Sequence, residues 1–173
     1  MFDKSVLVKI IFTLTLTCLF LAASFAVEPG YSVGKEAPDF KLMPVGGGKP
    51  VSLSQLRGKP VVVVYWAAWC GPCRKEIPEL KKLYDKYSPK GVQFVSIAVG
   101  WKQSEDDVAK FKTAQSLPYQ VLFDKDNKVA QEWKIQSIPT NLIIDLDGVI
   151  RYREYAIFPE AEDILQSMIR QDT

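Results

Sequence analysis

The feature that most constrains this chain is a run of β-branched and aromatic residues, Val61–Trp66, followed after a short gap by Cys70-Gly71-Pro72-Cys73. Such a run fits a central strand that is covered on both faces. A helix is predicted directly after it, from about residue 70 to residue 87, because apolar residues recur there at helical spacing. The two cysteines are therefore expected where a buried strand turns into a helix.

The spacing of the cysteines indicates a redox-active dithiol. Two residues between them, in the first turn of a helix, bring the sulfurs of Cys70 and Cys73 close enough to form a disulfide. Cys70 lies at the helix N-terminus, where free backbone N–H groups and the helix dipole stabilise a thiolate. Cys73 lies one turn further in, shielded and placed to attack a mixed disulfide on Cys70. Pro72 suits this turn because the N–H that it lacks would be unpaired there.

The composition excludes several kinds of site. The chain has no histidine, which rules out Cys–His and Ser–His catalysis. Its formal charge of +2 on 173 residues gives no electrostatic reason to expect nucleic-acid binding. A structural zinc site needs four ligands, and there is no second pair of cysteines at this spacing, so we expect no metal and no cofactor. An inert structural disulfide is disfavoured because closing so short a loop stabilises little.

The N-terminus is typical of an export signal. Lys4 and Lys9 precede the uncharged apolar run Ile10–Ala26, and Ser24-Phe25-Ala26 fits a signal-peptidase site. A retained membrane anchor is the alternative, since the run approaches the length of a membrane-spanning helix. Cys18 lies in this run and is either removed with it or acylated. In both cases the folded part is exported to the periplasm or another extracytoplasmic site, where a disulfide is permissible.

We divide the chain into a signal peptide or anchor (residues 1–26), a linker (27–36) and one domain (37–173). Strands are predicted over residues 39–43, 51–53, 61–66, 92–99, 119–123, 140–145 and 149–155, and helical segments over 54–58, 70–87, 105–114, 127–133 and 160–170. Strands joined by helices are expected to pair in parallel. Asp147-Gly148 predicts a hairpin that makes the sheet mixed.

The motifs resemble a known family. Trp69-Cys70-Gly71-Pro72-Cys73 after a β run matches the thioredoxin fold. Ala37-Pro38-Asp39-Phe40, Leu56-Arg57-Gly58-Lys59 and Cys73-x-x-Glu76-x-Pro78 resemble the TlpA/ResA-like family of exported thioredoxin-fold thiol–disulfide oxidoreductases, within the AhpC/TSA–redoxin superfamily. The resemblance runs from about Gly34 to the C-terminus. It implies an α/β fold with a mixed central sheet flanked by helices, an N-terminal β-hairpin extension and a central βα insertion.

The resemblance also implies a substrate-binding surface. The family carries a cis-proline loop beside its cysteines, and the matching dipeptide is Ile138-Pro139. We expect this peptide bond to be cis and the backbone of Ile138 to be presented to a substrate strand. Trp69, Gly71 and Pro72 are expected to complete this surface.

Glu76 matches the family's acidic residue near the active site. Three residues after Cys73, a partly buried carboxylate would have a raised pKa and could relay a proton to or from Cys73. Val64 stands where thioredoxin itself carries a buried Asp, which favours Glu76 as the substitute proton carrier. The alternative is a solvated Glu on the helix surface.

The expected activity is reduction of disulfides in exported proteins, with apocytochrome c as one candidate substrate. Gly71-Pro72 is the dipeptide of thioredoxin, whose potential is about −270 mV. We expect a membrane thiol electron donor to reduce the dithiol again after each reaction. The enzyme is expected to be a monomer. It would contact the membrane only if its N-terminal segment is retained.

Three other activities are open. One is a dithiol oxidase or isomerase. Another is a thiol peroxidase. Ala67 argues against it, because a peroxidase carries Thr at this position, three residues before the reactive cysteine. The third is a non-catalytic binding module or chaperone that uses the apolar surface around Trp69, and it predicts that Cys70→Ser keeps function intact.

Overall fold

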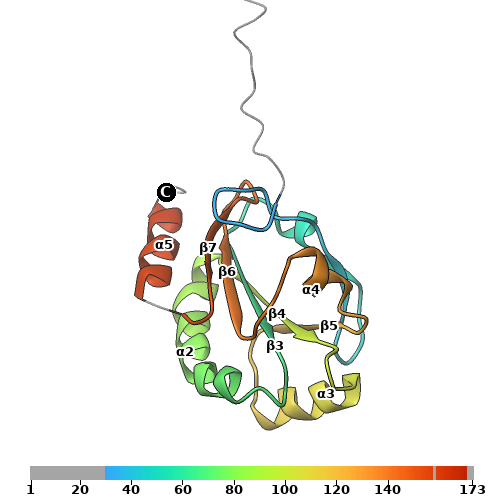
Figure 1. The fold of residues 1–173 in the computed structure, drawn as a ribbon. Helices are drawn as coiled ribbons and strands as arrows, with labels where there is room; N and C mark the ends of the chain where they lie inside the picture. Colours follow the sequence, from blue (N-terminus) through green and yellow to red (C-terminus); the bar gives the residue numbers. More distant parts are fainter. Residues whose placement is uncertain (1–29, 158, 171–173) are drawn as a thin grey trace, which may run out of the picture.

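The computed structural model describes residues 30–157 and 159–170, over which seven strands form one mixed sheet flanked by helices (Figure 1). The strands are β1 (Lys41–Pro44), β2 (Val51–Ser52), β3 (Val61–Trp66), β4 (Gln93–Val99), β5 (Gln120–Asp124), β6 (Thr140–Ile144) and β7 (Ile150–Glu154). The helices are α2 (Gly71–Tyr87), α3 (Glu105–Ala114), α4 (Lys128–Glu132) and α5 (Pro159–Arg170), with 3-10 turns η1 (Leu53–Leu56) and η2 (Ser88–Lys90). The strand order across the sheet is β2-β1-β5-β4-β3-β6-β7.

β3 lies inside the sheet, with β4 and β6 as its neighbours, and every one of its residues is buried. Its branched side chains favour the extended backbone and fill both faces. β3 pairs in parallel with β4, and β4 pairs in parallel with β5. The predicted central strand is therefore confirmed, and the chain leaves it directly toward α2.

The expectation that all helix-joined strands pair in parallel is wrong for β6. This strand runs antiparallel to β3, with Thr140 opposite Tyr65. α4, which precedes β6, has five residues, so it advances only about 7.5 Å, less than half of the roughly 17 Å that a strand of this length spans. The rest of the link between β5 and β6, residues 125–139, returns the chain to the edge where β5 ends. β6 consequently begins at the edge where β3, β4 and β5 end.

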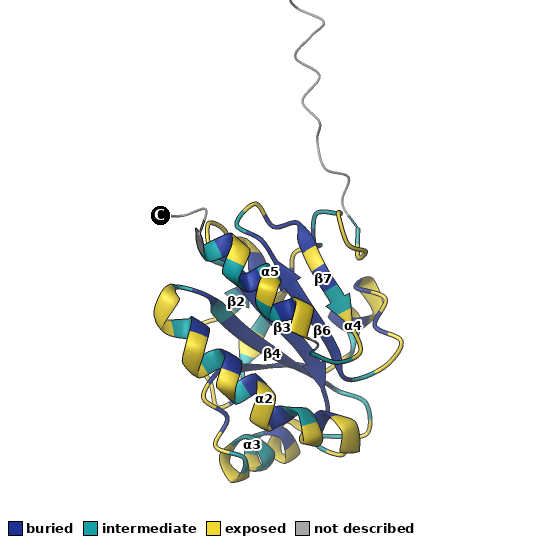
Figure 2. Ribbon diagram, turned by 90° about the vertical axis from the view of Figure 1, so that its left-hand side faces the viewer, coloured by how far each residue is buried: buried dark blue, intermediate teal, exposed yellow. Residues whose placement is uncertain are grey.

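α2 and α5 cover one face of the sheet, as Figures 1 and 2 show from two sides. Ile77 of α2 and Val64 of β3 line one small cavity, which places α2 on the face that carries Val64. Lys86 of α2 and Glu162 of α5 form an ion pair, which joins the two helices. α2 is thus packed against the sheet and joined to α5 by an ion pair on its solvent-exposed side.

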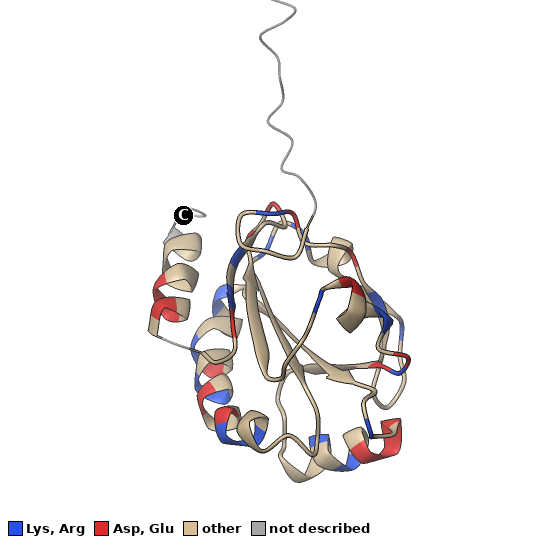
Figure 3. Ribbon diagram, in the orientation of Figure 1, with Lys and Arg blue, Asp and Glu red and all other residues tan. Residues whose placement is uncertain are grey.

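α4 lies on the opposite face. Trp133, the residue after α4, is buried, and its ring centroid lies 5.9 Å from that of Tyr65 and 6.2 Å from that of Phe40. Charged side chains lie mainly on helices and loops, whereas β3, β4 and β6 carry none (Figure 3). The two faces therefore form two apolar layers around a charge-free sheet centre.

The N-terminal extension and α3 agree with the sequence-based expectations. β1 and β2 form an antiparallel hairpin, and β1 adds antiparallel to β5. α3 begins after Ser104, whose Oγ accepts the N–H of Asp107 at 3.2 Å while the Asp107 carboxylate accepts the N–H of Ser104 at 2.9 Å. This reciprocal cap explains why the helix begins where the sequence predicts.

The predicted signal peptide or anchor, with Cys18, lies outside the described residues. Of the segment assigned to a linker, Gly34 donates its N–H to the Ile150 carbonyl and Lys35 accepts the N–H of Ile150. Glu36 bridges to Val149. Within residues 30–157 and 159–170, no helix is both long and apolar enough to cross a membrane.

Trp133 provides a test of the core. We expect Trp133→Ala to lower the free energy of unfolding by about 3–5 kcal/mol, because it leaves a cavity against Phe40 and Tyr65. Urea denaturation followed by far-UV circular dichroism measures the loss. Tyr155→Ala is the matched control, since Tyr155 is exposed, and its effect should stay within about 0.5 kcal/mol. Equal effects of the two substitutions would contradict this packing.

Candidate active site

The dithiol pair lies at the start of α2. Cys70 is the N-cap residue, and its Sγ accepts the backbone N–H of Cys73 at 3.1 Å. The two sulfurs are bonded at 2.04 Å. Because unpaired N–H groups and the positive end of the helix dipole gather here, this position stabilises a Cys70 thiolate once the disulfide is reduced. Both cysteines therefore lie where the sequence predicts, at the N-cap and in the first turn of α2.

The exposure of the site differs between the sulfurs and their surroundings. Cys70 and Cys73 are only 3% and 5% exposed, so shielding is not confined to the second cysteine. Trp69, Gly71 and Pro72 are exposed around them, with Trp69 at 48%. A partner reaching Cys70 must therefore pass over an apolar rim.

Trp69 is fixed by the segment that follows β4. Its ring Nε1–H donates to the Trp101 carbonyl at 2.6 Å. The neighbouring Ala68 N–H donates to Gln103 Oε1 at 2.8 Å. These contacts hold the loop between β3 and α2 against the loop between β4 and α3. No sequence signal predicted them, because they join segments that are more than 30 residues apart.

The Ile138-Pro139 loop lies beside Cys70. Its peptide bond is cis, as expected. The Ile138 carbonyl oxygen is 3.7 Å from Cys70 Sγ. Ile138 is half-buried and Pro139 is buried. The loop reaches this place because β6 begins at the edge of the sheet where β3 ends.

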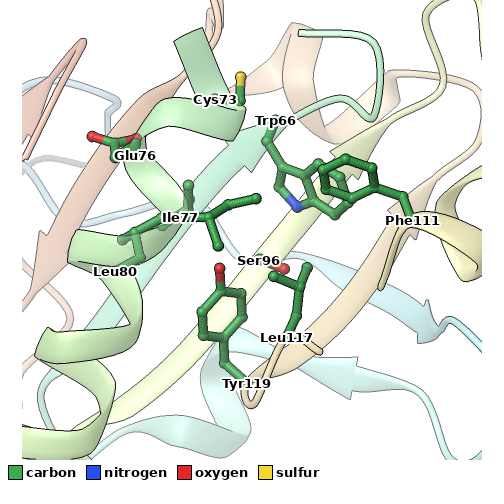
Figure 4. A pocket seen from close by; sticks show the side chains of 10 residues that line it. Trp66, Cys73, Glu76, Ile77, Leu80, Ser96, Phe111, Leu117 and Tyr119 are labelled. Atoms are coloured by element: carbon green, nitrogen blue, oxygen red, sulfur yellow. The ribbon is translucent and has the colours of Figure 1, made fainter. Parts of the chain in front are cut away.

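Glu76 is half-buried on α2, one helical turn after Cys73 (Figure 4). Burial raises the pKa of its carboxyl group, while hydrogen bonds from Asn141 and the Ile157 backbone oppose the rise. Asn141 Nδ2 donates to both carboxylate oxygens at 2.9 and 3.1 Å, and Ile157 N–H donates to Oε1 at 2.6 Å. The direction of the predicted shift is confirmed. Both hydrogen-bond partners come from distant segments that the sequence did not identify.

A small cavity of about 10 Å³ lies behind the dithiol, between α2, the sheet and α3 (Figure 4). It is lined by Val64, Trp66, Cys73, Glu76, Ile77, Leu80, Ser96, Phe111, Leu117 and Tyr119. Trp66 is buried, as expected, and its ring centroid is 5.1 Å from that of Phe111. Burial, and secondly the charge of Glu76, raise the pKa of Tyr119. Cys73 and Glu76 thus share one enclosed, largely apolar space.

Comparison with known proteins agrees with this site. The AhpC/TSA family model matches residues 33–153. The thiol-disulfide oxidoreductase ResA of Bacillus anthracis is 33% identical over 149 residues, covering 86% of this chain and 83% of that protein. The thioredoxin-like protein YneN of Bacillus subtilis is 37% identical over 128 residues, covering 72% of each chain. The thioredoxin domain of a thiol-disulfide oxidoreductase from Bacteroides vulgatus superposes with a TM-score of 0.71 at 26% identity, covering 79% of this chain and 98% of that domain.

The burial of Glu76 has a consequence for stability. Its pKa is higher in the folded protein than the ordinary 4.5, so the folded state holds this proton more tightly than the unfolded state does. The stability contribution of Glu76 is therefore greatest below pH 4.5 and falls as the pH rises through the folded pKa. We expect the melting temperature of Glu76→Gln to rise relative to that of the wild type as the pH increases from 4.5 to the folded pKa of Glu76. Above that pKa the difference between the two should stay constant.

Thermal melts from about pH 4 to pH 8 measure this difference. Glu79→Gln is the control, because Glu79 is an exposed residue of the same helix that pairs with Lys82. A Glu76→Gln difference that stays constant or falls with pH would show that burial does not disfavour the ionised carboxylate.

Proposed function

Since the chain belongs to the AhpC/TSA family and is a ResA-like thioredoxin-fold thiol–disulfide oxidoreductase, we propose that it reduces disulfides of extracytoplasmic proteins. Cys70 is the attacking group and Cys73 the resolving group. The observation that carries the assignment of roles is the position of Cys70 Sγ, which caps α2 and accepts the Cys73 N–H at 3.1 Å. A negative charge on that sulfur is stabilised before any substrate arrives.

The proposed reaction has two exchange steps. The Cys70 thiolate attacks one substrate sulfur, forming a mixed disulfide and releasing the other substrate sulfur as a thiolate, which takes a proton. Cys73 then loses its proton and attacks the Cys70 sulfur, which releases the second substrate thiolate. The substrate gains two electrons and two protons, and the enzyme is left with the Cys70–Cys73 disulfide. A membrane thiol donor returns the two electrons.

Glu76 serves as the proton acceptor for Cys73. The two residues are neighbours at i and i+3 on α2 and line the same cavity. The volume of about 10 Å³ is close to the least space that a water molecule occupies, so one water in this cavity would carry the proton between them. A carboxyl group whose pKa is raised by burial is also a suitable acid for the reverse step.

Trp69, Gly71, Pro72 and Ile138 form the proposed substrate surface. The first three are exposed around the buried Cys70. The Ile138 backbone, whose carbonyl lies 3.7 Å from Cys70 Sγ, is available to an extended substrate segment. Recognition by backbone contacts and an apolar rim fits substrates that share a disulfide rather than a sequence.

The proposed setting is the extracytoplasmic side of a membrane. It rests on the export pattern of residues 1–26 and on the relatedness to ResA. Apocytochrome c is a candidate substrate within this class, and we expect the enzyme to act as a monomer.

The reduction potential tests the direction of transfer. We expect a value near the roughly −270 mV of thioredoxin, because the Gly71-Pro72 dipeptide is the same and no histidine stands between the cysteines to stabilise the reduced form further. Equilibration with glutathione buffers, followed by alkylation of free thiols, measures it. A potential near the −120 mV or so of DsbA would identify an oxidase instead.

Trapping tests the substrate class. A full-length Cys73→Ser variant cannot resolve its mixed disulfides, so substrates should stay bonded to Cys70 and be recovered under non-reducing conditions. We expect exported proteins with paired cysteines; recovery of c-type apocytochromes would narrow the class to haem-protein maturation.

Two variants control the trapping. Cys70→Ser combined with Cys73→Ser should capture nothing. Trp69→Ala combined with Cys73→Ser should capture less, because the exposed ring beside Cys70 is lost. Capture of cytoplasmic proteins alone would contradict the proposed setting.

A further inference from the structure

Asn141 is a buried amide beside the proposed proton carrier. It lies on β6 directly opposite Val64 of β3 and is 0% exposed. Opposed residues of an antiparallel pair lie on the same face of a sheet, so its side chain meets α2 rather than α4. The residue is therefore held at a sheet position from which its amide bonds to the Glu76 carboxylate.

Only one end of the Asn141 amide has a partner among the described residues. Nδ2 donates to Glu76 Oε1 at 2.9 Å and to Oε2 at 3.1 Å. Oδ1 is buried and accepts no hydrogen bond from any residue of the described ranges. Ile157 N–H donates to Oε1 at 2.6 Å and leaves Oε2 facing the amide alone. The amide thus bonds to both carboxylate oxygens, and it is the partner of Oε2 among the described residues, whereas Oε1 also has a backbone donor.

We propose that Asn141 is a positioning residue for proton transfer by Glu76, because its amide can bond to the carboxyl group in both protonation states. When Glu76 is ionised, Nδ2 donates to it. When Oε2 is protonated, the amide turns over and Oδ1 accepts the O–H. Ile157 N–H stays on Oε1 throughout, so the carboxyl group keeps its position while its proton comes and goes.

The physical reason is the cost of an unpaired polar group in a buried site. A partner that only donates would leave the O–H of the protonated carboxyl group unpaired, and a partner that only accepts would oppose ionisation. An amide carries one donor end and one acceptor end of nearly the same shape. Among the described residues nothing bonds to Oδ1, so turning the amide over breaks no other hydrogen bond. The protonation state of Glu76 therefore decides which end of the amide faces the carboxyl group.

The other groups around Glu76 do not supply this exchange. Tyr119, from the segment before β5, lines the same cavity, but the hydrogen bonds to the Glu76 carboxylate within the described ranges come from Asn141 and Ile157. The Ile157 backbone can only donate. Glu162 of α5 accepts hydrogen bonds from Lys86 and Tyr87, further along α2. Cys73 is the thiol that exchanges its proton in the proposed mechanism.

The inference rests on the proposed role of Glu76, so its test must separate the two. Reaction of the reduced full-length protein with Ellman's reagent releases a first coloured thiolate when Cys70 attacks. It releases a second when Cys73 displaces the reagent from Cys70, in a phase that does not depend on reagent concentration. The pH profile of this second phase reports loss of the proton from Cys73.

We expect Asn141→Leu to move the Glu76-dependent midpoint of that profile upward, by up to about one pH unit, because the charge-assisted hydrogen bond to the ionised carboxylate is stronger than the bond to the neutral acid and both are lost. Asn141→Asp, nearly identical in shape, should move it further through charge repulsion. In a Glu76→Gln background, Asn141→Leu should leave the profile unchanged. Melting curves identify any variant that fails to fold, and Asn141→Asp and Asn141→Leu substitute for one another in that case.

Two results would overturn the inference. One is an unmoved midpoint in both Asn141 variants, and the other is a shift that persists without Glu76. If Glu76→Gln itself leaves the profile of the wild type intact, the proposed role of Glu76 fails first.

A spectroscopic readout needs no substitution. The side-chain amide signals of Asn141 in a ¹⁵N-correlated NMR spectrum should titrate with the same midpoint as the Glu76 carboxyl carbon. An amide signal that does not change with pH would contradict the turnover.

Discussion

The antiparallel pairing of β6 with β3 is the constraint on which the rest of the active site depends. It places Thr140 opposite Tyr65 and Asn141 opposite Val64, at the edge where β3 passes into α2. Because β6 begins at that edge, the loop before it reaches Cys70, and the strand itself supplies the amide that bonds to Glu76. A parallel β6 would begin at the far edge and bring neither group to the dithiol.

Within this frame, α2 shifts two acids in opposite directions. At its first residue the helix offers N–H groups and a positive dipole end, which favour the thiolate of Cys70. One turn beyond Cys73 the same helix carries Glu76 into a half-buried position, where desolvation disfavours the carboxylate. The two effects serve different steps of the proposed reaction: the ionised Cys70 attacks the substrate, whereas a carboxylate that is disfavoured by burial is a better base for the proton of Cys73.

Sequence signals that act locally predicted most of the fold. β3 and α3 have the predicted bounds, because a β-branched run and a reciprocal Ser104–Asp107 cap are encoded in adjacent residues. The direction of β6 was not predictable from the order of elements, since it depends on the path of the whole link 125–139, in which α4 is a single short turn of helix. Cys70, Cys73 and Glu76 were found from a motif, but Asn141 is 65 residues from Glu76 in the sequence and shares no motif with it. Only the register of β6 brings the two together.

The enclosure of Cys70 has a consequence for which molecules the enzyme can serve. At 3% exposure, with Trp69, Gly71 and Pro72 around it, this sulfur offers no flat surface to a compact domain. A disulfide that is buried inside a folded domain cannot reach this sulfur, whereas a disulfide on a protruding, flexible segment can. The depth of the sulfur below its rim therefore sets how far a disulfide must project from its own surroundings in order to reach it.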